Sequence, residues 1–198
     1  MKLPIKEILF CLILALFGTA HAVEIAGVKI EEATQSAANN TPLKLNGAGI
    51  RYKVFFKVYV AALYLTETQN TEAGVFAVGG PKKINLTMLR ELSSDTLGQA
   101  FMDGVKRNTE KSERAKMLDQ FLKFGQLFST VPELKKGDVV ALEWTPNVGT
   151  NVYINGKKTG DTFQDVAFFN AVLRIWLGEN PVDSSLKKQL LGGTVDKH

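Results

Sequence analysis

Arg51 is the residue whose type and setting most directly suggest chemistry in this chain. It stands in the segment LNGAGIRYKVFFKVYVAALYL, residues 45–65, after two glycines and before a strand-like run that also holds Lys53, Lys57 and Tyr59. An arginine stays charged at any relevant pH and can bind a carboxylate through two parallel hydrogen bonds. Because a buried guanidinium without an anion is strongly unfavourable, we predict a partner for Arg51, either an internal Asp or Glu or an anion bound from outside.

The strand after Arg51 indicates what such an anion would look like. If the strand is continuous, its alternate side chains point to opposite faces. One face would carry Arg51, Lys53, Phe55, Lys57, Tyr59, Ala61 and Leu63. The other would be a core face of Tyr52, Val54, Phe56, Val58, Val60, Ala62 and Tyr64. The first face is cationic at one end and apolar at the other, which suits a carboxylate on an acyl or aromatic body. We interpret Lys53 and Lys57 themselves as solvated lysines whose stems lie along the sheet.

Several common chemistries are excluded by the residues that the body of the chain lacks. The single cysteine is Cys11, and the two histidines are His21 and His198, close to the two ends. Between them there is no histidine for a catalytic triad, a zinc site or general-base catalysis, and no thiolate. The chain contains no Walker A, G-x-G-x-x-G, G-x-S-x-G or EF-hand pattern. We therefore predict no metal site and no cofactor.

Residues 1–22 have the pattern of a cleaved secretory signal. A basic start precedes an apolar run at residues 8–17, and Ala20 and Ala22 fit the small-x-small rule of signal peptidase. The run is too short to cross a bilayer, which needs roughly twenty residues. A retained anchor and a lipoprotein signal at Cys11 are the alternatives. We predict export to the periplasm or secretion, no stable membrane insertion after cleavage, and one domain over residues 23–198.

The charge of residues 23–198 does not indicate a nucleic-acid partner. This part of the chain has 22 basic and 19 acidic residues, a net charge of +3. The lysines are scattered, whereas nucleic-acid binders usually carry a basic stripe with interleaved aromatic residues. We interpret them as a solvated surface.

Hydrophobic periodicity predicts a block of strands followed by helices. Strands are expected over residues 23–30, 42–65 (with a turn or bulge at 46–49), 83–89, 139–144 and 150–154, with a hairpin turn at Asn155 and Gly156 and a loop over 31–42. Helices are expected over residues 96–108 after a cap at Ser93, Ser94 or Asp95, 113–128, 162–177 capped by Asp161, and 184–191 capped by Asp183. Because strands and helices do not alternate regularly, the pattern favours an α+β fold with helices on one face of an antiparallel sheet.

The segment with a Leu-x-Gly-x-Gly-x-Arg start and a closing Tyr-Leu pair resembles the chalcone isomerase superfamily. Residues 144–192, and above all FFNAVLRIWLGENPVD at 168–183, are similar to its bacterial, exported chalcone isomerase-like branch. The resemblance implies an open-faced β-sandwich, a large curved and mostly antiparallel sheet with helices on one face and a ligand cleft between them. Plant members convert chalcones to flavanones, while other members bind fatty acids or act as non-catalytic helpers.

The resemblance also implies site residues. The family's arginine, which polarises a substrate or holds a carboxylate, falls on Arg51, and its catalytic strand threonine falls on Tyr59. Its helix tyrosine and the following asparagine fall on Phe101 and Asn108, and a late-helix threonine or serine falls on Ile175. These five are the predicted ligand-binding residues, and Arg51 with Tyr59 would be the catalytic pair of an enzyme. Phe101 and Ile175 lack the enzyme's hydroxyls, so most of its polar set is missing while the arginine remains.

Three functions are compatible with this sequence. The first is binding of a small amphipathic carboxylate, such as a fatty acid, at Arg51 without plant-type catalysis. The second is an isomerase or intramolecular lyase acting on an aromatic enone, in which Arg51 polarises the carbonyl and Tyr59 or a water stabilises the oxyanion. The third is a structural or partner-binding domain with a filled cleft. Trp144, Phe168, Phe169 and Trp176 are candidates for the cleft walls, and plain core is the alternative for each.

Overall fold

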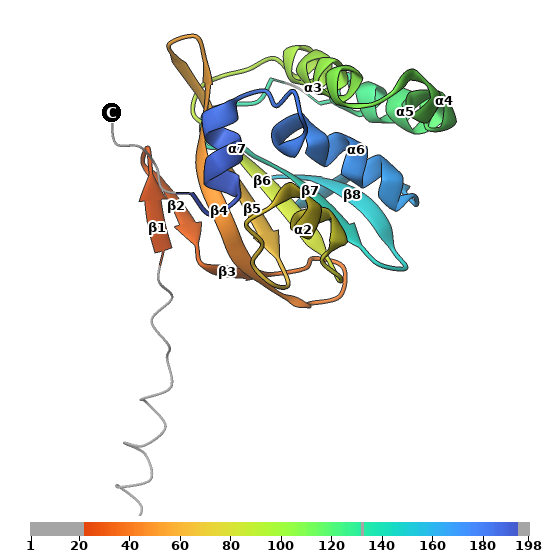
Figure 1. The fold of residues 1–198 in the computed structure, drawn as a ribbon. Coiled ribbons are helices and arrows are strands. Elements are labelled where there is room, and N and C mark those ends of the chain that lie inside the picture. Colours follow the sequence, from red (N-terminus) through yellow and green to blue (C-terminus); the bar gives the residue numbers. More distant parts are fainter. Residues whose placement is uncertain (1–21, 132, 194–198) are drawn as a thin grey trace, which may run out of the picture.

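A curved seven-stranded antiparallel sheet is the frame of the molecule (Figure 1). The computed structural model describes residues 22–131 and 133–193. The strands follow one another in sequence order across the sheet: β3 (Ala33–Gln35), β4 (Pro42–Lys53), β5 (Phe56–Leu65), β6 (Lys82–Met88), β7 (Val139–Thr145), β8 (Gly149–Ile154) and β9 (Lys157–Phe163). A separate hairpin consists of β1 (Ala22–Ile25) and β2 (Val28–Glu31).

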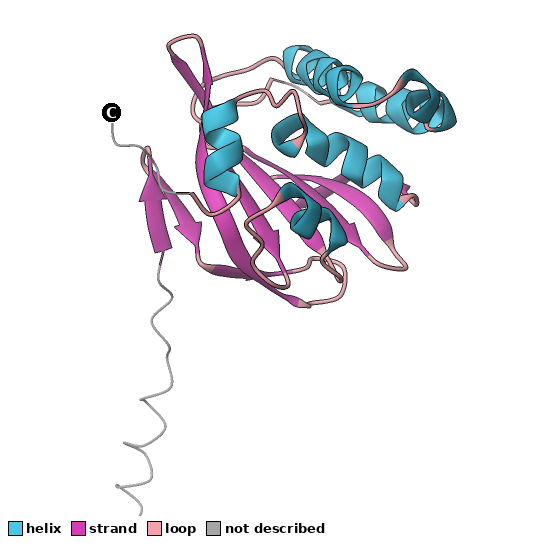
Figure 2. Cartoon of the chain, in the orientation of Figure 1, coloured by secondary structure: helices cyan, strands magenta, loops and turns pink. Residues whose placement is uncertain are grey.

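The helices gather on one side of this sheet, as Figures 1 and 2 show. They are α2 (Glu72–Ala77), α3 (Ser94–Asn108), α4 (Lys111–Lys116), α5 (Leu118–Ser129), α6 (Val166–Leu177) and α7 (Ser184–Leu190). Helix α7 packs on β4 and α6 contacts β8, while α3 packs against both α6 and α5. The expected α+β fold, an antiparallel sheet with helices on one face, is confirmed.

The sheet has a core on each face. On the helix side, Tyr59, Ala61 and Leu63 of β5 join the large core formed with α3, α5 and α6. On the opposite side, Val60 and Ala62 belong to a smaller core that includes residues of the β1–β2 hairpin. The face that carries Tyr59 was expected to be a graded ligand surface and the other to be the core. Both faces of β5 are buried, because helices cover one and the β1–β2 hairpin covers the other.

Residues 42–65 do not form one continuous strand, so that expectation is wrong. Strand β4 ends at Lys53, Val54 and Phe55 form a two-residue turn, and Lys53 pairs with Phe56 as β5 begins. Tyr52, Val54 and Phe56, expected in a core, are exposed as a result. None of the turn residues is Gly, Pro, Asn or Asp, so the usual composition signal of a hairpin is missing.

The expected irregularity at residues 46–49 is a β-bulge, since the β4–β5 register shifts between Leu45 and Gly47. The bulged residue, Asn46, ties distant segments together. Its Nδ2 donates to the backbone oxygens of Leu190 (2.7 Å) and Gln69 (2.9 Å), and its Oδ1 accepts the Gln69 N–H at 2.6 Å. The first long strand is thereby fixed to the C-terminal helix α7.

Other element boundaries differ from the expected ones for local reasons. Asp161 does not cap a helix: residues 161–163 complete β9, and the cap of α6 is Asp165, which accepts the Ala167 N–H. The expected helix 113–128 divides at Met117 into α4 and α5. The expected strand 23–30 divides into β1 and β2 at a turn that uses Gly27 at φ +82°. Strand β3 lies inside the expected loop, and α2 was not expected.

Two N-caps agree with the sequence. Ser93 caps α3 by accepting the Thr96 N–H, and Asp183 caps α7 by accepting the N–H groups of Ser185 and Leu186. Apart from Ala22, the leader expected at residues 1–22 lies outside the described residues, as do Cys11, His21 and His198. In the part of the chain that the structure describes, no helix is long and apolar enough to cross a membrane.

Candidate functional site

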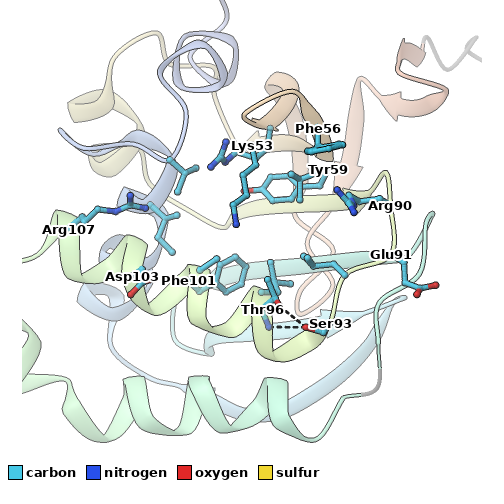
Figure 3. A pocket seen from close by; sticks show the side chains of 17 residues that line it. Lys53, Phe56, Tyr59, Arg90, Glu91, Ser93, Thr96, Phe101, Asp103 and Arg107 are labelled. Atoms are coloured by element: carbon cyan, nitrogen blue, oxygen red, sulfur yellow. Dashed lines mark hydrogen bonds between the residues drawn. The ribbon is translucent and has the colours of Figure 1, made fainter.

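A cavity of about 510 Å³ opens between the β4–β5 hairpin and helix α3 (Figure 3). Its apolar wall is formed by Phe56, Val58, Leu92, Leu97, Ala100, Phe101, Ile175 and Val182. Its polar residues are Arg51, Lys53, Tyr59, Arg90, Glu91, Ser93, Thr96, Asp103 and Arg107. The cavity thus combines an apolar wall with several cationic groups.

Four of the five predicted ligand-binding residues line this cavity: Arg51, Tyr59, Phe101 and Ile175. Asn108 does not. Its Nδ2 donates to the backbone oxygens of Gly104 and Asn180, and its Oδ1 accepts the Asn180 N–H, so it ties the end of α3 to the loop after α6. Whether the other four bind a ligand stays a prediction.

Lys53 also lines the cavity, although we interpreted it as an ordinary solvated lysine. Its side chain extends from the hairpin toward α3, beside Tyr59 and above Phe101 (Figure 3). Trp144, Phe168, Phe169 and Trp176, the candidates for cleft walls, do not line it, and all four belong to or pack against the large core.

Arg51 has both an internal partner and a cavity beside it. It lies on the helix-facing side of β4, directly opposite Tyr59 in the β4–β5 ladder. Its Nη1 is 3.8 Å from Oδ2 of Asp183, and its side chain is 20% exposed. The same carboxylate caps α7 and accepts the Tyr52 N–H at 3.1 Å. At 3.8 Å the ion pair is longer than a hydrogen bond, so the guanidinium keeps donors for another anion.

Tyr59 brings a neutral hydroxyl to the same place. The Trp176 indole N–H donates to its oxygen at 2.9 Å. Burial raises the pKa of Tyr59 to about 12, so the hydroxyl holds its proton at any ordinary pH. Among the described residues no acceptor for that proton lies within hydrogen-bond distance. Tyr59 can therefore donate to an oxygen of a bound molecule.

Positive charge predominates around the cavity. Four cationic side chains line it, against the carboxylates of Glu91 and Asp103. The Arg90 guanidinium lies over the Phe56 ring, 5.2 Å from its centroid. Within the described ranges, no carboxylate comes within ion-pair distance of Lys53 or Arg107. Such a surplus of unpaired cations attracts anions.

Arg107 and Asp103 were missed by reasoning from the sequence. They belong to a stripe of Thr96, Ala100, Asp103 and Arg107 along α3, at spacings of four, three and four residues. Such spacing places side chains on one helix face. This stripe of small and polar residues runs beside the apolar stripe of Leu97, Phe101 and Val105. It is the signal in the sequence that could have located the α3 wall of the cavity.

Comparisons with known proteins agree with this architecture. The crystal structure of a fatty-acid binding protein from Arabidopsis thaliana is similar, with a TM-score of 0.58 and 15% sequence identity, over 81% of this chain and 96% of that chain. At that identity the similarity concerns the fold alone. No match was found among curated proteins. A family model described as chalcone isomerase-like matches residues 22–192. The chain therefore belongs to the chalcone isomerase-like family.

Proposed function

We propose that the protein binds a small amphipathic carboxylate, such as a fatty acid, in the cavity beside Arg51, without plant-type catalysis. The observation that carries this proposal is the pairing of a guanidinium and a neutral tyrosine hydroxyl in a cavity that also has an extended apolar wall. From the leader pattern we propose that the protein acts in the periplasm or as a secreted protein.

The carboxylate end of such a ligand fits the cationic part of the cavity. Arg51 supplies charge-assisted hydrogen bonds, and Tyr59 donates a further one. Lys53 and Arg107, which have no ion-pair partner among the described residues, add long-range attraction. A carboxylate bound there would compete with Asp183 for Arg51.

The tail of the ligand fits the apolar part. Val58, Leu97, Phe101 and Ile175 offer a surface without hydrogen-bonding groups. The volume of about 510 Å³ lies within the range of about 300–1,000 Å³ that is common for small-molecule pockets. The similar Arabidopsis protein is described as a fatty-acid binding protein, which supports the ligand class.

Ligand binding is tested by displacement of a fluorescent fatty-acid analogue from delipidated protein, together with native mass spectrometry of protein as purified. Arg51→Ala is expected to weaken palmitate binding about 10- to 100-fold, because hydrogen bonds to charged groups contribute about 1.5–3 kcal/mol. Arg174→Ala is the matched control, since Arg174 forms an ion pair with Glu113 and does not line the cavity. If no acyl ligand is found and Arg51→Ala binds palmitate as the unchanged protein does, the proposal fails.

An isomerase is the alternative function, and one observation favours it. Arg51 and Tyr59 bring two donors to one cavity, which is what a developing oxyanion requires. Phe101 and Ile175 offer no further hydroxyl. The decay of naringenin chalcone absorbance, with Arg51→Ala as the control, distinguishes the two functions: a rate equal to the spontaneous one removes the isomerase for that substrate.

A further inference from the structure

The turn of the β4–β5 hairpin exposes three consecutive apolar side chains. Val54 is 77% exposed, Phe55 89% and Phe56 62%. We call these three residues the apolar tip. The hairpin projects from the sheet beyond the neighbouring helices (Figure 1). Contiguous exposed apolar side chains, unlike single scattered ones, mark surfaces that contact something else.

The backbone of the apolar tip shows that its residues do not suit the turn. Val54 has φ +58°, a left-handed conformation that is a clear outlier for a β-branched residue. The β8–β9 hairpin of the same sheet turns instead at Asn155 (φ +50°) and Gly156 (φ +78°), the residues that such turns favour. Where a sequence breaks a local rule without a structural gain, a functional site is the expected reason.

Cationic side chains surround the apolar tip. Lys53 and Lys57 flank it in sequence and are exposed, and the Arg90 guanidinium lies over the Phe56 ring. Residues 51–60 contain no acidic residue, and Glu91, next to Arg90, is the carboxylate nearest in sequence to this group of cations. Aromatic side chains with lysine and arginine around them match the interface of a bilayer, where apolar groups enter the lipid and cations meet anionic headgroups.

We propose that the apolar tip is a peripheral membrane-docking element that enters the surface of an anionic bilayer reversibly, with Lys53, Lys57 and Arg90 at headgroup level. This inference stands on the exposure and charge of the hairpin and does not depend on the ligand proposed above. Phe56, Lys53 and Arg90 also line the cavity. Docking therefore places the mouth of the cavity at a lipid surface, where amphipathic carboxylates are concentrated.

Co-sedimentation with vesicles tests the docking. One set of vesicles contains phosphatidylglycerol with phosphatidylcholine and the other contains phosphatidylcholine alone, and binding is expected to be stronger to the first. Phe55→Ser is expected to weaken binding about tenfold, because the docked protein would lose one phenylalanine side chain from the apolar part of the bilayer. Leu122→Ser is the matched control, because Leu122 is 54% exposed on α5, away from the hairpin, and it should change nothing.

The charges are tested in the same way. Lys57→Ala is expected to weaken binding to the anionic vesicles about fivefold, since each basic residue near such a surface contributes about that factor. Lys157→Ala removes an exposed lysine from the β8–β9 hairpin and should have no effect. All comparisons use the same full chain, so any contribution of residues 1–21 is common to every variant.

Absence of binding to anionic vesicles overturns the proposal, and so does an equal loss in Phe55→Ser and Leu122→Ser. A concentration-dependent dimer that Phe55→Ser dissociates would assign the apolar tip to a second copy of the chain instead. Phe55 does not line the cavity, so Phe55→Ser is expected to bind palmitate normally. The failure of docking and the failure of ligand binding are therefore observed separately.

Discussion

Trp176 on α6 donates its indole N–H to the hydroxyl of Tyr59 on β5 over 2.9 Å, which joins the helix layer to the sheet at the wall of the cavity. Trp176 is fully buried and Tyr59 nearly so. The hydroxyl that faces the cavity is therefore also part of the core. A change at this position should affect both the stability of the protein and its ligand.

Tyr59→Phe is expected to lower the free energy of unfolding by about 1–3 kcal/mol, because it leaves the buried Trp176 N–H without an acceptor. It should also weaken palmitate binding through the lost hydroxyl donor. Urea denaturation and ligand displacement measure the two effects. Tyr64→Phe, on the opposite face of the same strand, removes a bond to the Glu31 backbone oxygen and should leave palmitate affinity unchanged. Normal palmitate affinity in Tyr59→Phe would show that its hydroxyl does not contact the ligand.

The same burial predicts a loss of stability in alkali. Desolvation raises the pKa of Tyr59, and separately that of Tyr64, from 10.0 to about 12 in the folded protein. The unfolded chain releases these protons near pH 10 while the folded protein still holds them, so unfolding is favoured as pH rises from 10 to 12. The stability that the two protonated phenols contribute is fully present below pH 10 and is lost as pH rises through about 12.

Thermal melts across this range, with tyrosinate absorbance as the ionisation signal, should show a falling midpoint. The fall should be shallower in Tyr59→Phe, which has only one of the two buried phenols. A midpoint in Tyr59→Phe that falls as steeply as that of the unchanged protein would contradict this prediction.

Asp183→Asn is expected to strengthen palmitate binding by up to about fivefold, because Asp183 is the internal competitor for Arg51 and partly exposed ion pairs contribute up to about 1 kcal/mol. The asparagine retains an oxygen that can cap α7. Ligand displacement measures the effect, and Glu113→Gln, which removes the partner of Arg174, is the control. A weaker affinity in Asp183→Asn would mean that the carboxylate orients Arg51 for the ligand.

Gly47→Ala is expected to destabilise the protein more than Gly49→Ala, because α7 lies directly on β4. A methyl group at Gly47 would collide with the backbone oxygen of Gln189, whereas one at Gly49 meets the movable end of the Gln189 side chain. Overpacking of this kind lowers the free energy of unfolding by about 1–3 kcal/mol. Each kcal/mol corresponds to a fall of about 2–4 °C in melting temperature for a chain of this length. Gly79→Ala, with open space around it, is the control. Equal melting temperatures for the two β4 variants would contradict this reading.

The sequence predicted the architecture well where a hydrophobic pattern is accompanied by a capping residue or a glycine signal. Helix α3 begins at the expected serine cap, α7 at the expected aspartate cap, and the bulge lies among the expected glycines. It failed at the β4–β5 turn, since Val54 and Phe55 have strand propensity and only the tertiary structure makes them turn. It also misplaced the cap of α6, because Asp161 and Asp165 are chemically equivalent candidates and only the pairing of β9 with β8 decides between them.

The candidate site was predictable only in part. Arg51 could be identified from its type and setting, and Tyr59, Phe101 and Ile175 from a resemblance. The partner of Arg51 could not be chosen, because Asp183 is more than a hundred residues away and also fits a purely structural role as a helix cap. Asn108 was assigned to the site by position along α3, yet its amide is satisfied by backbone groups outside the cavity.

The Asn46 bulge also sets an order of events in folding. The Asn46 side-chain amide donates to the backbone oxygen of Leu190 in α7, which lies 144 positions further along the chain. Such non-local contacts form late and slow the folding of a chain, because loop-closure entropy must be overcome first. We therefore expect the contact between β4 and α7 to be among the last to gain protection from hydrogen exchange, and a chain that ends before α7 to lack this contact.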